Sequence, residues 1–359
     1  MHLGIPALLE FYRNHREQDS LVLATITGTE GSTYRKPGAM MLIEPGGGFE
    51  GMISGGCLEG DLMQHAEAVF QSGEPAFVTY DMHAGEDLVW SLGLGCDGII
   101  HLLLQRLDRV NGFGFLQHLE EAHAAGANAL LALVTGEGGG YVPGACGLLD
   151  STGRESGEPA LNAVLQAHSK PWPDWRFLDL AAGQSALDGR VMLVNARRQT
   201  RALICGAGPD AVPLARQLTQ LNWQVQVMDH RPDYARSSRF PEACQVVLAR
   251  PEQLDQHLDA AGIDAAIIMS HHLENDARYL ERLAPARIPY IGLLGPRARR
   301  ARLSEMAGVD LSRAHGPAGL EIGAELPEAI ALSVAAEMHA VLNDRDGQKL
   351  TLRADAESR

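Results

Sequence analysis

The chain has 359 residues, of which 45% are hydrophobic and 21% charged, and a formal net charge of −15. This length is too great for one ordinary core and predicts a globular protein of two α/β domains. The negative charge argues against nonspecific binding to nucleic acid or to an anionic membrane. No apolar run approaches the roughly 18 residues of a membrane span. The start lacks a basic leader and a small-residue cleavage site, so a cytoplasmic location is expected.

The first unusual segment is the loop of residues 28–38. It follows a short amphipathic helix at residues 5–16 and a strand at 21–26, and a strand at 39–43 returns from it. Ser32, Arg35 and Lys36 stand there among three glycines, a composition that suits an anion cradle. The alternative interpretation is a polar hairpin connection whose charged pair is solvated.

A thiol stands at the predicted start of the next helix. Gly55 and Gly56 precede Cys57, and apolar residues then recur at helical spacing from Leu58 to Phe70. A helix N-terminus lowers the pKa of a thiol and favours the thiolate, whereas Glu59 in the same turn opposes this effect. The alternative is that Cys57 is a small buried packing residue.

A second thiol lies in a similar bend. Cys96 belongs to the glycine-rich run 93–98 between apolar segments, where the backbone can approach a ligand closely. Five cysteines at irregular spacing, without a CxxC pair, indicate neither a disulfide framework nor a zinc knuckle. Only the fold would bring Cys57 and Cys96 together. Elements predicted at 113–125, 127–135, 159–168 and 191–195 complete an N-terminal domain at 1–195, with a variable part at about 102–190.

Residues 201–231 read as strand, glycine turn, helix and second strand. The segment 206–211 is a GxGxxA fingerprint, in which Gly206 permits a tight turn and Gly208 lets the backbone approach a phosphate. Asp229 ends the second strand about 20 residues later, where a ribose-binding acid is expected. It favours NAD, while Arg231 leaves NADP open. The alternatives are an empty scaffold, or another anion at the helix N-terminus.

Strands predicted at 245–248, 265–269 and 290–294 alternate with helices, which indicates a parallel doubly wound sheet. The domain extends over 196–342, ends in a helix at 327–342, and leaves a tail at 343–359 that we expect to be mobile. Ligands of such sheets bind beyond the strand C-termini. His271 and Arg297 fall at that edge. His271 would serve as a proton shuttle, a hydrogen-bond donor or a ligand, or it is simply a hydrogen-bonded polar group at a strand end. The arginines from 297 to 302 are expected to form a mostly solvated helix face, from which Arg297 could meet an anion.

Taken together, these segments resemble the XdhC/CoxI family, accessory proteins for xanthine dehydrogenase and related molybdenum hydroxylases. The ordered motifs carry the resemblance: residues 31–40, 55–59, 92–98, 206–208, 269–271, 290–292 and 319–324. The resemblance implies an N-terminal α/β domain followed by a Rossmann-like domain. It also implies a chaperone that binds molybdenum cofactor (molybdopterin), protects it during sulfuration, and delivers it to the hydroxylase large subunit. A cysteine desulfurase is an implied second partner, and a homodimer is expected.

The residues agree with this resemblance. Ser32, Arg35 and Lys36 would hold the phosphate of the cofactor, and Cys57 and Cys96 are candidate soft ligands for molybdenum. This hypothesis requires both thiol bends to fold beside the Rossmann crevice. The competing hypothesis is an NAD(P)-dependent oxidoreductase with its nicotinamide near His271, although no catalytic acid/base pair is evident beyond that histidine.

Overall fold

The computed structural model describes residues 4–56, 58–82, 98–111, 113–136, 142–168, 175–180, 189–242 and 244–352. The chain divides into two compact units, residues 1–198 and residues 199–359. Each is a mixture of helices and strands, and the second contains a parallel sheet, so the predicted α/β class is confirmed.

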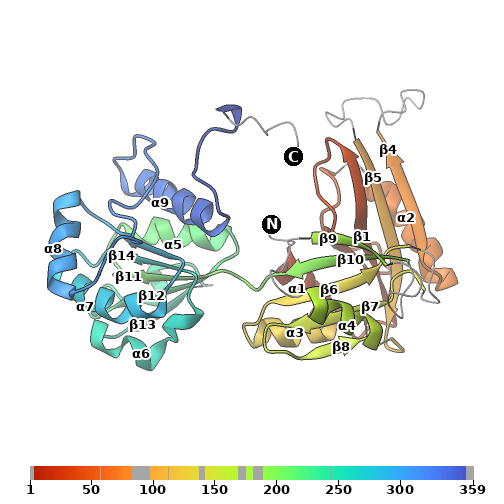
Figure 1. The fold of residues 1–359 in the computed structure, drawn as a ribbon, viewed down its shortest axis with the longest axis horizontal. Coiled ribbons are helices and arrows are strands. Elements are labelled where there is room, and N and C mark those ends of the chain that lie inside the picture. The colour runs from red at the N-terminus through yellow and green to blue at the C-terminus, as the bar shows by residue number, and fades with distance from the viewer. Residues whose placement is uncertain are drawn as a thin grey trace. The chain divides into compact units, whose positions relative to one another are not determined.

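The N-terminal unit begins with an antiparallel five-stranded sheet in the order β3-β2-β1-β5-β4 (Figure 1). Its central strand is buried on both faces: Val22, Ala24 and Ile26 pack with helix α2, while Leu21 and Leu23 face a second core that contains helix α1. This two-sided burial explains the continuous apolar run in the sequence. The elements are α1 (Ile5–His15), β1 (Ser20–Gly31), β2 (Met40–Ile43), β3 (Phe49–Gly51), α2 (Glu59–Ser72), β4 (Ala76–Asp81) and β5 (Gly98–Asp108).

A second antiparallel sheet, in the order β8-β7-β6-β10-β9, completes this unit. Its apolar side chains, such as Leu131 and Val194, share one core with Leu23 and Leu103 of the first sheet. The two sheets therefore form one body. The elements are α3 (Leu116–Ala124), β6 (Ala129–Val134), β7 (Cys146–Asp150), β8 (Glu155–Gly157), α4 (Pro159–His168), β9 (Trp175–Leu180) and β10 (Gly189–Ala196).

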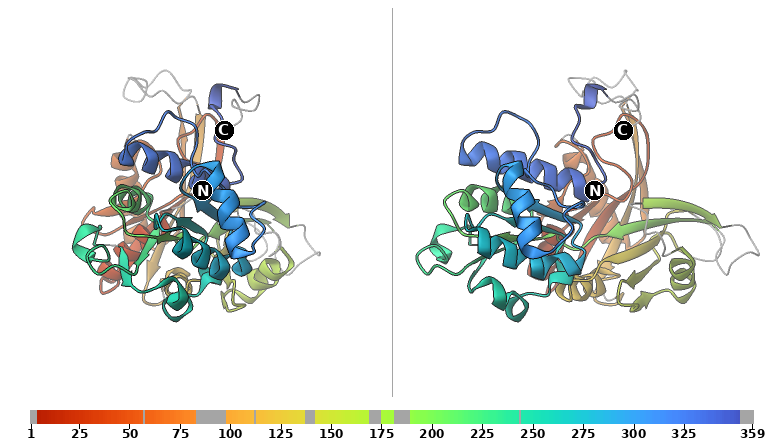
Figure 2. Two further views of the ribbon diagram at one scale, coloured as in Figure 1. Left: turned by 90° about the vertical axis from the view of Figure 1, so that its left-hand side faces the viewer. Right: turned by 60° about the vertical axis from the view of Figure 1, so that its left-hand side comes forward.

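The C-terminal unit is built on a parallel sheet in the order β13-β12-β11-β14-β15. Helices α5 and α9 pack on one face, and α6, α7 and α8 on the other (Figure 2). His315 adds a parallel bridge to Gly292, which extends the order to the 3-2-1-4-5-6 arrangement of dinucleotide-binding sheets. The strands are β11 (Arg201–Cys205), β12 (Gln224–Asp229), β13 (Gln245–Leu248), β14 (Ala265–Ile268) and β15 (Tyr290–Leu293). The helices are α5 (Ala211–Gln220), α6 (Leu254–His257), α7 (Leu273–Leu283), α8 (Arg297–Ala307) and α9 (Pro327–Leu342).

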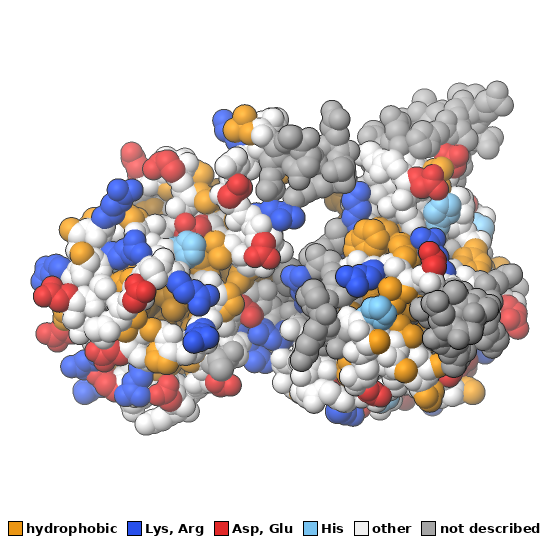
Figure 3. Space-filling model, viewed as in Figure 1, with side chains coloured by type: hydrophobic (Ala, Val, Ile, Leu, Met, Phe, Trp, Pro, Cys, Tyr) orange, Lys and Arg blue, Asp and Glu red, His pale blue; other side chains and the backbone are white. Residues whose placement is uncertain are grey.

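The surface of the C-terminal unit carries charges of both signs. Acidic and basic side chains are interspersed on the face drawn in Figure 3. Among the described residues, no helix combines the length and the apolar character that crossing a membrane requires.

Candidate functional site

Strand register places the three N-terminal motifs at one end of the first sheet. Gly31, the last residue of β1, pairs with Gly98, the first residue of β5. In the same direction β2 begins with Met40 and β3 finishes with Gly51, at the level of Thr25 and Ala24 of β1. The loop 32–38 and the segment before Gly98 therefore leave the sheet at Gly31 and Gly98, and the loop 52–58 leaves in the same direction from nearer the middle of β1. We call this end the motif end.

Gly98 shows how tightly the motif end is built. A Cβ atom on this residue would lie 2.5 Å from the carbonyl oxygen of Ser32 and 2.7 Å from that of Glu30. Only glycine fits such an approach of two backbones. Gly98, the last residue of the motif 92–98, is thus pressed against residues 30–33, where the motif 31–40 begins.

Arg35 is half-buried at the motif end, and it has no carboxylate partner among the described residues. Its Nε is buried without a hydrogen-bond partner in that part of the chain. Burial lowers the pKa of the guanidinium, which nonetheless stays charged because it starts from such a high value. Lys36 is also half-buried, and Ser32 is exposed. A partly desolvated cation without an anion favours the predicted anion cradle over a solvated charged pair.

Glu59 organises the loop that precedes α2. Its carboxylate is 8% exposed and accepts hydrogen bonds from Ser54 N–H (3.0 Å), Ser54 Oγ (2.6 Å) and Leu58 N–H (3.1 Å). Burial alone would raise the pKa of Glu59, but these hydrogen bonds outweigh burial and hold the pKa below its ordinary value. Both chain segments that flank residue 57 are thereby held.

Gly55 and Gly56 have open space beside them. Gly56 adopts a φ of 105°, a conformation that favours glycine. A Cβ atom built on either residue meets no described atom within 4 Å. Cys57 and Cys96 lie outside the described residues, so their predicted roles stay predictions. The described residues next to them, Gly56 and Leu58 beside Cys57 and Gly98 near Cys96, belong to the same group of motifs as Arg35.

In the C-terminal unit, the predicted glycine turn packs against the end of β14. Gly206 has a φ of 117°, and a Cβ there would lie 2.6 Å from the Cα of Ser270. A Cβ on Gly208 would lie 2.6 Å from Oδ1 of Asp210. The turn therefore needs glycine at position 206 for its tight curvature, and the approach of a phosphate to Gly208 stays a prediction.

Asp229 is engaged by protein groups on both oxygens. The carboxylate is 1% exposed and accepts Ala207 N–H at 2.7 Å, while Arg231 donates its Nε at 2.9 Å and a terminal nitrogen at 2.7 Å. Burial alone would raise the pKa of Asp229, and these hydrogen bonds lower it below its ordinary value. A ribose hydroxyl would reach this acid only if Arg231 moved.

His271 completes the edge of the crevice. It has a φ of 60°, and its Nε2 lies 2.8 Å from Oδ2 of Asp210, across the glycine turn. The imidazole is 58% exposed, so solvent or a ligand can reach it. The structure thus brings His271 together with the glycine turn, and it identifies Asp210 as the partner of the histidine.

A second ion pair lies directly behind this edge. Asp276 is 1% exposed and accepts the backbone N–H of Ser270 at 3.1 Å and the guanidinium of Arg299 at 2.6 Å. The prediction that the arginines of α8 form a mostly solvated face is wrong for Arg299, which turns toward this carboxylate, and for Arg300, which donates to the carbonyl of Leu311 at 2.5 Å.

Arg297 lies elsewhere. It is exposed at the start of α8 and lines a cavity of about 690 Å³ together with Arg300 and Ser312. That cavity is not lined by the glycine turn or by His271. The structure therefore groups Gly206, Gly208, Asp229 and His271, but it does not add Arg297 to them.

The described cysteines are not activated thiols. Burial raises the pKa of Cys146 to about 11, and it also raises the pKa values of Cys205 and Cys244. Within the described ranges, no group of three or more His, Cys, Asp or Glu side chains is arranged to hold a metal ion.

Comparison with known proteins decides the family. Residues 202–338 match the model of the XdhC Rossmann domain, and residues 15–81 match that of the XdhC and CoxI family. A Bacillus subtilis protein described as a probable xanthine dehydrogenase subunit is 34% identical over 345 residues, which covers 94% of this chain and 96% of that protein. The chain belongs to the XdhC and CoxI family.

Two further similarities place this XdhC and CoxI family member among known proteins. A crystal structure described as a xanthine dehydrogenase from Bacillus halodurans superposes with a TM-score of 0.79 at 28% identity, over 98% of each chain. The uncharacterized protein YqeB of Escherichia coli is 28% identical over 156 residues, which covers 41% of this chain and 28% of that protein. The family resemblance inferred from the motifs is confirmed.

Several site residues of this family member were missed from the sequence. Asp210 appeared only as a variable position of the fingerprint, and Glu59 only as an opponent of the thiolate. Ser54 stands five residues before Glu59 rather than the three of a capping box, so the hydrogen bonds between them also had no recognised signal. The pairing of Arg299 with Asp276 has no local signal.

Proposed function

We propose that this protein binds molybdenum cofactor as cargo, protects it during sulfuration, and delivers it to the large subunit of xanthine dehydrogenase or of a related molybdenum hydroxylase. The names of the relatives in Bacillus support the association with xanthine dehydrogenase. The observation that carries the proposal is Arg35, which is half-buried and has no described partner for its Nε, and which lies in the loop whose first residues pack against Gly98.

The residues at the motif end fit the chemistry of this cargo. Molybdenum cofactor combines a phosphate with a metal held by sulfur. Arg35, Lys36 and Ser32 would receive the phosphate, because a desolvated guanidinium binds such an anion strongly. No described atom lies within 4 Å of the place that a Cβ would take on Gly55 or Gly56. The soft thiolates of Cys57 and Cys96 would face the molybdenum.

The Rossmann crevice supports a second, weaker candidate, an NAD(P)-dependent oxidoreductase. The specific observation in its favour is the His271–Asp210 pair, since a carboxylate orients and polarises an imidazole for proton transfer. Against it stands Asp229, whose oxygens already accept protein donors. We therefore assign the crevice a subordinate role in which NAD(P) is not required.

The proposed cargo suggests which partners the protein has and what each of its two units does. The unit at 1–195 would hold the cofactor, and the Rossmann-like unit at 196–342 would support the exchange with the hydroxylase. We further propose a cysteine desulfurase as sulfur donor, a homodimeric assembly, and a cytoplasmic location, where cofactor and apoenzyme would meet.

The test is to purify the protein gently from a molybdenum-replete host and to measure molybdenum and fluorescent pterin per chain. We expect both in the wild type and a loss of at least tenfold in Cys57→Ala. Cys146→Ala is the matched control, because that half-buried thiol of the same unit packs against the core shared by its two sheets, and its loss should leave the load unchanged. NAD(P)H turnover that is indifferent to Cys57→Ala, with no pterin bound, would support the oxidoreductase instead.

A further inference from the structure

A buried glutamine without a partner marks a second cavity in the C-terminal unit. Gln226 is 8% exposed, and its side-chain amide makes no hydrogen bond to any residue that the structure describes. It lines a cavity of about 480 Å³, which is within the usual range for a small-molecule site. The amide faces the cavity, so an occupant with matching donor and acceptor groups could bind it in place of water.

This cavity lies at the opposite edge of the sheet from the glycine turn. Its walls include Arg201, Gln224 and Gln245, which are the first residues of β11, β12 and β13. The glycine turn, by contrast, follows the last residue of β11. The cavity is therefore separate from the Rossmann crevice, and none of its lining residues belongs to the motif end.

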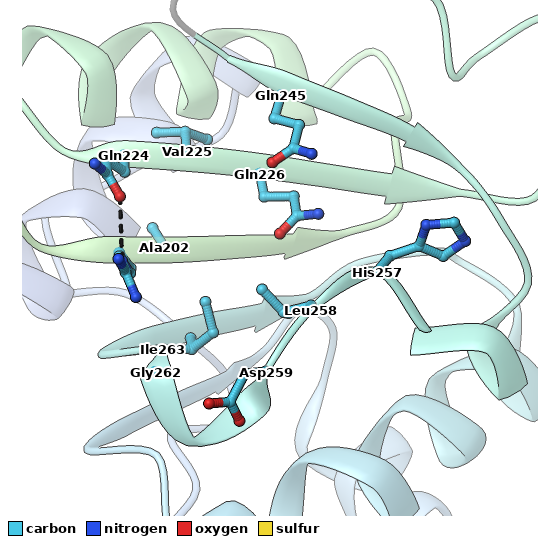
Figure 4. A pocket seen from close by; sticks show the side chains of 11 residues that line it. Ala202, Gln224, Val225, Gln226, Gln245, His257, Leu258, Asp259, Gly262 and Ile263 are labelled. Carbon is cyan, nitrogen blue, oxygen red and sulfur yellow. Dashed lines mark hydrogen bonds between the residues drawn. The ribbon is translucent and has the colours of Figure 1, made fainter. Parts of the chain in front are cut away.

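A second amide stands beside the first. Gln245 is aligned with Gln226 across the parallel strands β13 and β12, and Figure 4 shows both side chains directed to the same side of the sheet. The segment 257–263 faces them and contributes Leu258 and Ile263 as apolar walls. Two amides in one plane offer alternating N–H donors and C=O acceptors.

The charges around the cavity select against a strongly charged ligand. Arg201 donates its Nε to Oε1 of Gln224 at 3.1 Å, which places that cation at the rim. Asp259, of opposite sign, lies on the facing segment. The floor contributed by Gln226 and Gln245 is polar but uncharged, as a neutral hydrogen-bonding ring requires.

We infer that this cavity binds an uncharged planar nitrogen heterocycle, of the purine or pterin type, whose edge carries a donor beside an acceptor. Glutamine amides recognise such edges by paired hydrogen bonds, as they do with adenine in nucleic acids. Leu258 and Ile263 supply apolar contact beside the ring. The inference uses no residue of the motif end.

The test is isothermal titration of the full chain with guanosine, adenosine and 6-hydroxymethylpterin as separate probes. We expect saturable one-site binding of at least one of them, with an affinity at least tenfold lower in Gln226→Leu. Gln220→Leu, an exposed glutamine on α5 at the other face of the sheet, should bind as the wild type does. A purine response without a pterin response, or the reverse, identifies the ring.

Other outcomes would overturn the inference. If no probe binds saturably, or if Gln226→Leu binds equally well, the cavity is not the site. If Gln226→Leu fails to fold, the near-isosteric Gln226→Glu replaces it, since that change removes the amide donors and should alter the order of preference among the probes. A Gln226→Glu protein that keeps both affinity and preference contradicts the inference.

Discussion

The motif end of the N-terminal unit and the Rossmann crevice of the C-terminal unit treat their charges in opposite ways. In the crevice each buried carboxylate has a protein partner: Asp229 binds Arg231, and Asp276 binds Arg299. At the motif end Arg35 is half-buried, and no described carboxylate pairs with it. The described part of the chain supplies no negative partner for that cation.

This difference indicates that the charges of the crevice stabilise the fold, whereas the charge at the motif end is available to bind a ligand. Paired buried charges fix a structure but leave little unsatisfied for a guest, because breaking such a pair costs several kcal/mol. An unpaired, partly desolvated cation is costly in the free protein and is relieved by an anion. The glycine fingerprint therefore indicates the fold of the second unit, whereas the ligand chemistry is better indicated by the first unit.

The largest expected effect is on the paired side of the comparison. Asp276→Ala leaves Arg299 and the N–H of Ser270 without their acceptor, and should destabilise the C-terminal unit by about 3 kcal/mol. The measurement is hydrogen exchange of peptides from residues 199–342 in increasing urea. Asp255→Ala is the control, since its pair with Arg282 is about half exposed and should cost less than about 1 kcal/mol. Equal effects would mean that the crevice is not held by buried pairs.

The sequence predicts the scaffold of both units better than it predicts their sites. Helix α9 begins and ends where the apolar spacing of residues 327–342 indicates, and the parallel strands follow their β-branched runs. The short strands β8 and β9 were not predicted, because three to six residues without strong alternation carry little signal. Neither the helical nor the strand periodicity of the sequence shows which strands pair or in which register.

The side-chain pairings of the crevice are the features that the sequence did not predict. His271 and Asp210 are 61 residues apart in the chain, and Arg299 and Asp276 are 23 apart. Helix α8 buries only Leu303 among its eleven residues, so its own pattern does not show which arginine turns inward. The choice of Arg299 is made by the position of Asp276 on α7, which belongs to tertiary structure alone.

A smaller effect is expected at Glu59. Glu59→Gln keeps the shape of the side chain but weakens the hydrogen bonds from Ser54 and Leu58, and should cost about 1–2 kcal/mol at pH 7. Because the pKa of Glu59 is lowered in the folded protein, its contribution is complete above the unfolded pKa of about 4.3 and is lost as the pH falls through the folded value.

The measurement for Glu59 is thermal unfolding at pH 7 and at pH 3. The difference between wild type and Glu59→Gln should shrink at the lower pH. Glu67→Gln, on the exposed side of the same helix, should differ little from the wild type at either pH. A gap between wild type and Glu59→Gln that persists at pH 3 would show that hydrogen bonds from a charged Glu59 are not what holds the loop.

The smallest effect is expected at Arg35, and it distinguishes the two regions most directly. Since no described group depends on its guanidinium, Arg35→Met should change the stability of the free protein by less than about 0.5 kcal/mol. Inorganic phosphate at ten times its Kd should stabilise the wild type by about 1.4 kcal/mol and leave Arg35→Met unaffected, as followed by thermal unfolding. Arg16→Met, whose side chain is 52% exposed, should respond to phosphate as the wild type does. A loss of about 2 kcal/mol or more in Arg35→Met without phosphate, near the cost of removing a buried partner, would make Arg35 a structural group like Arg299, and the contrast between the two regions would disappear.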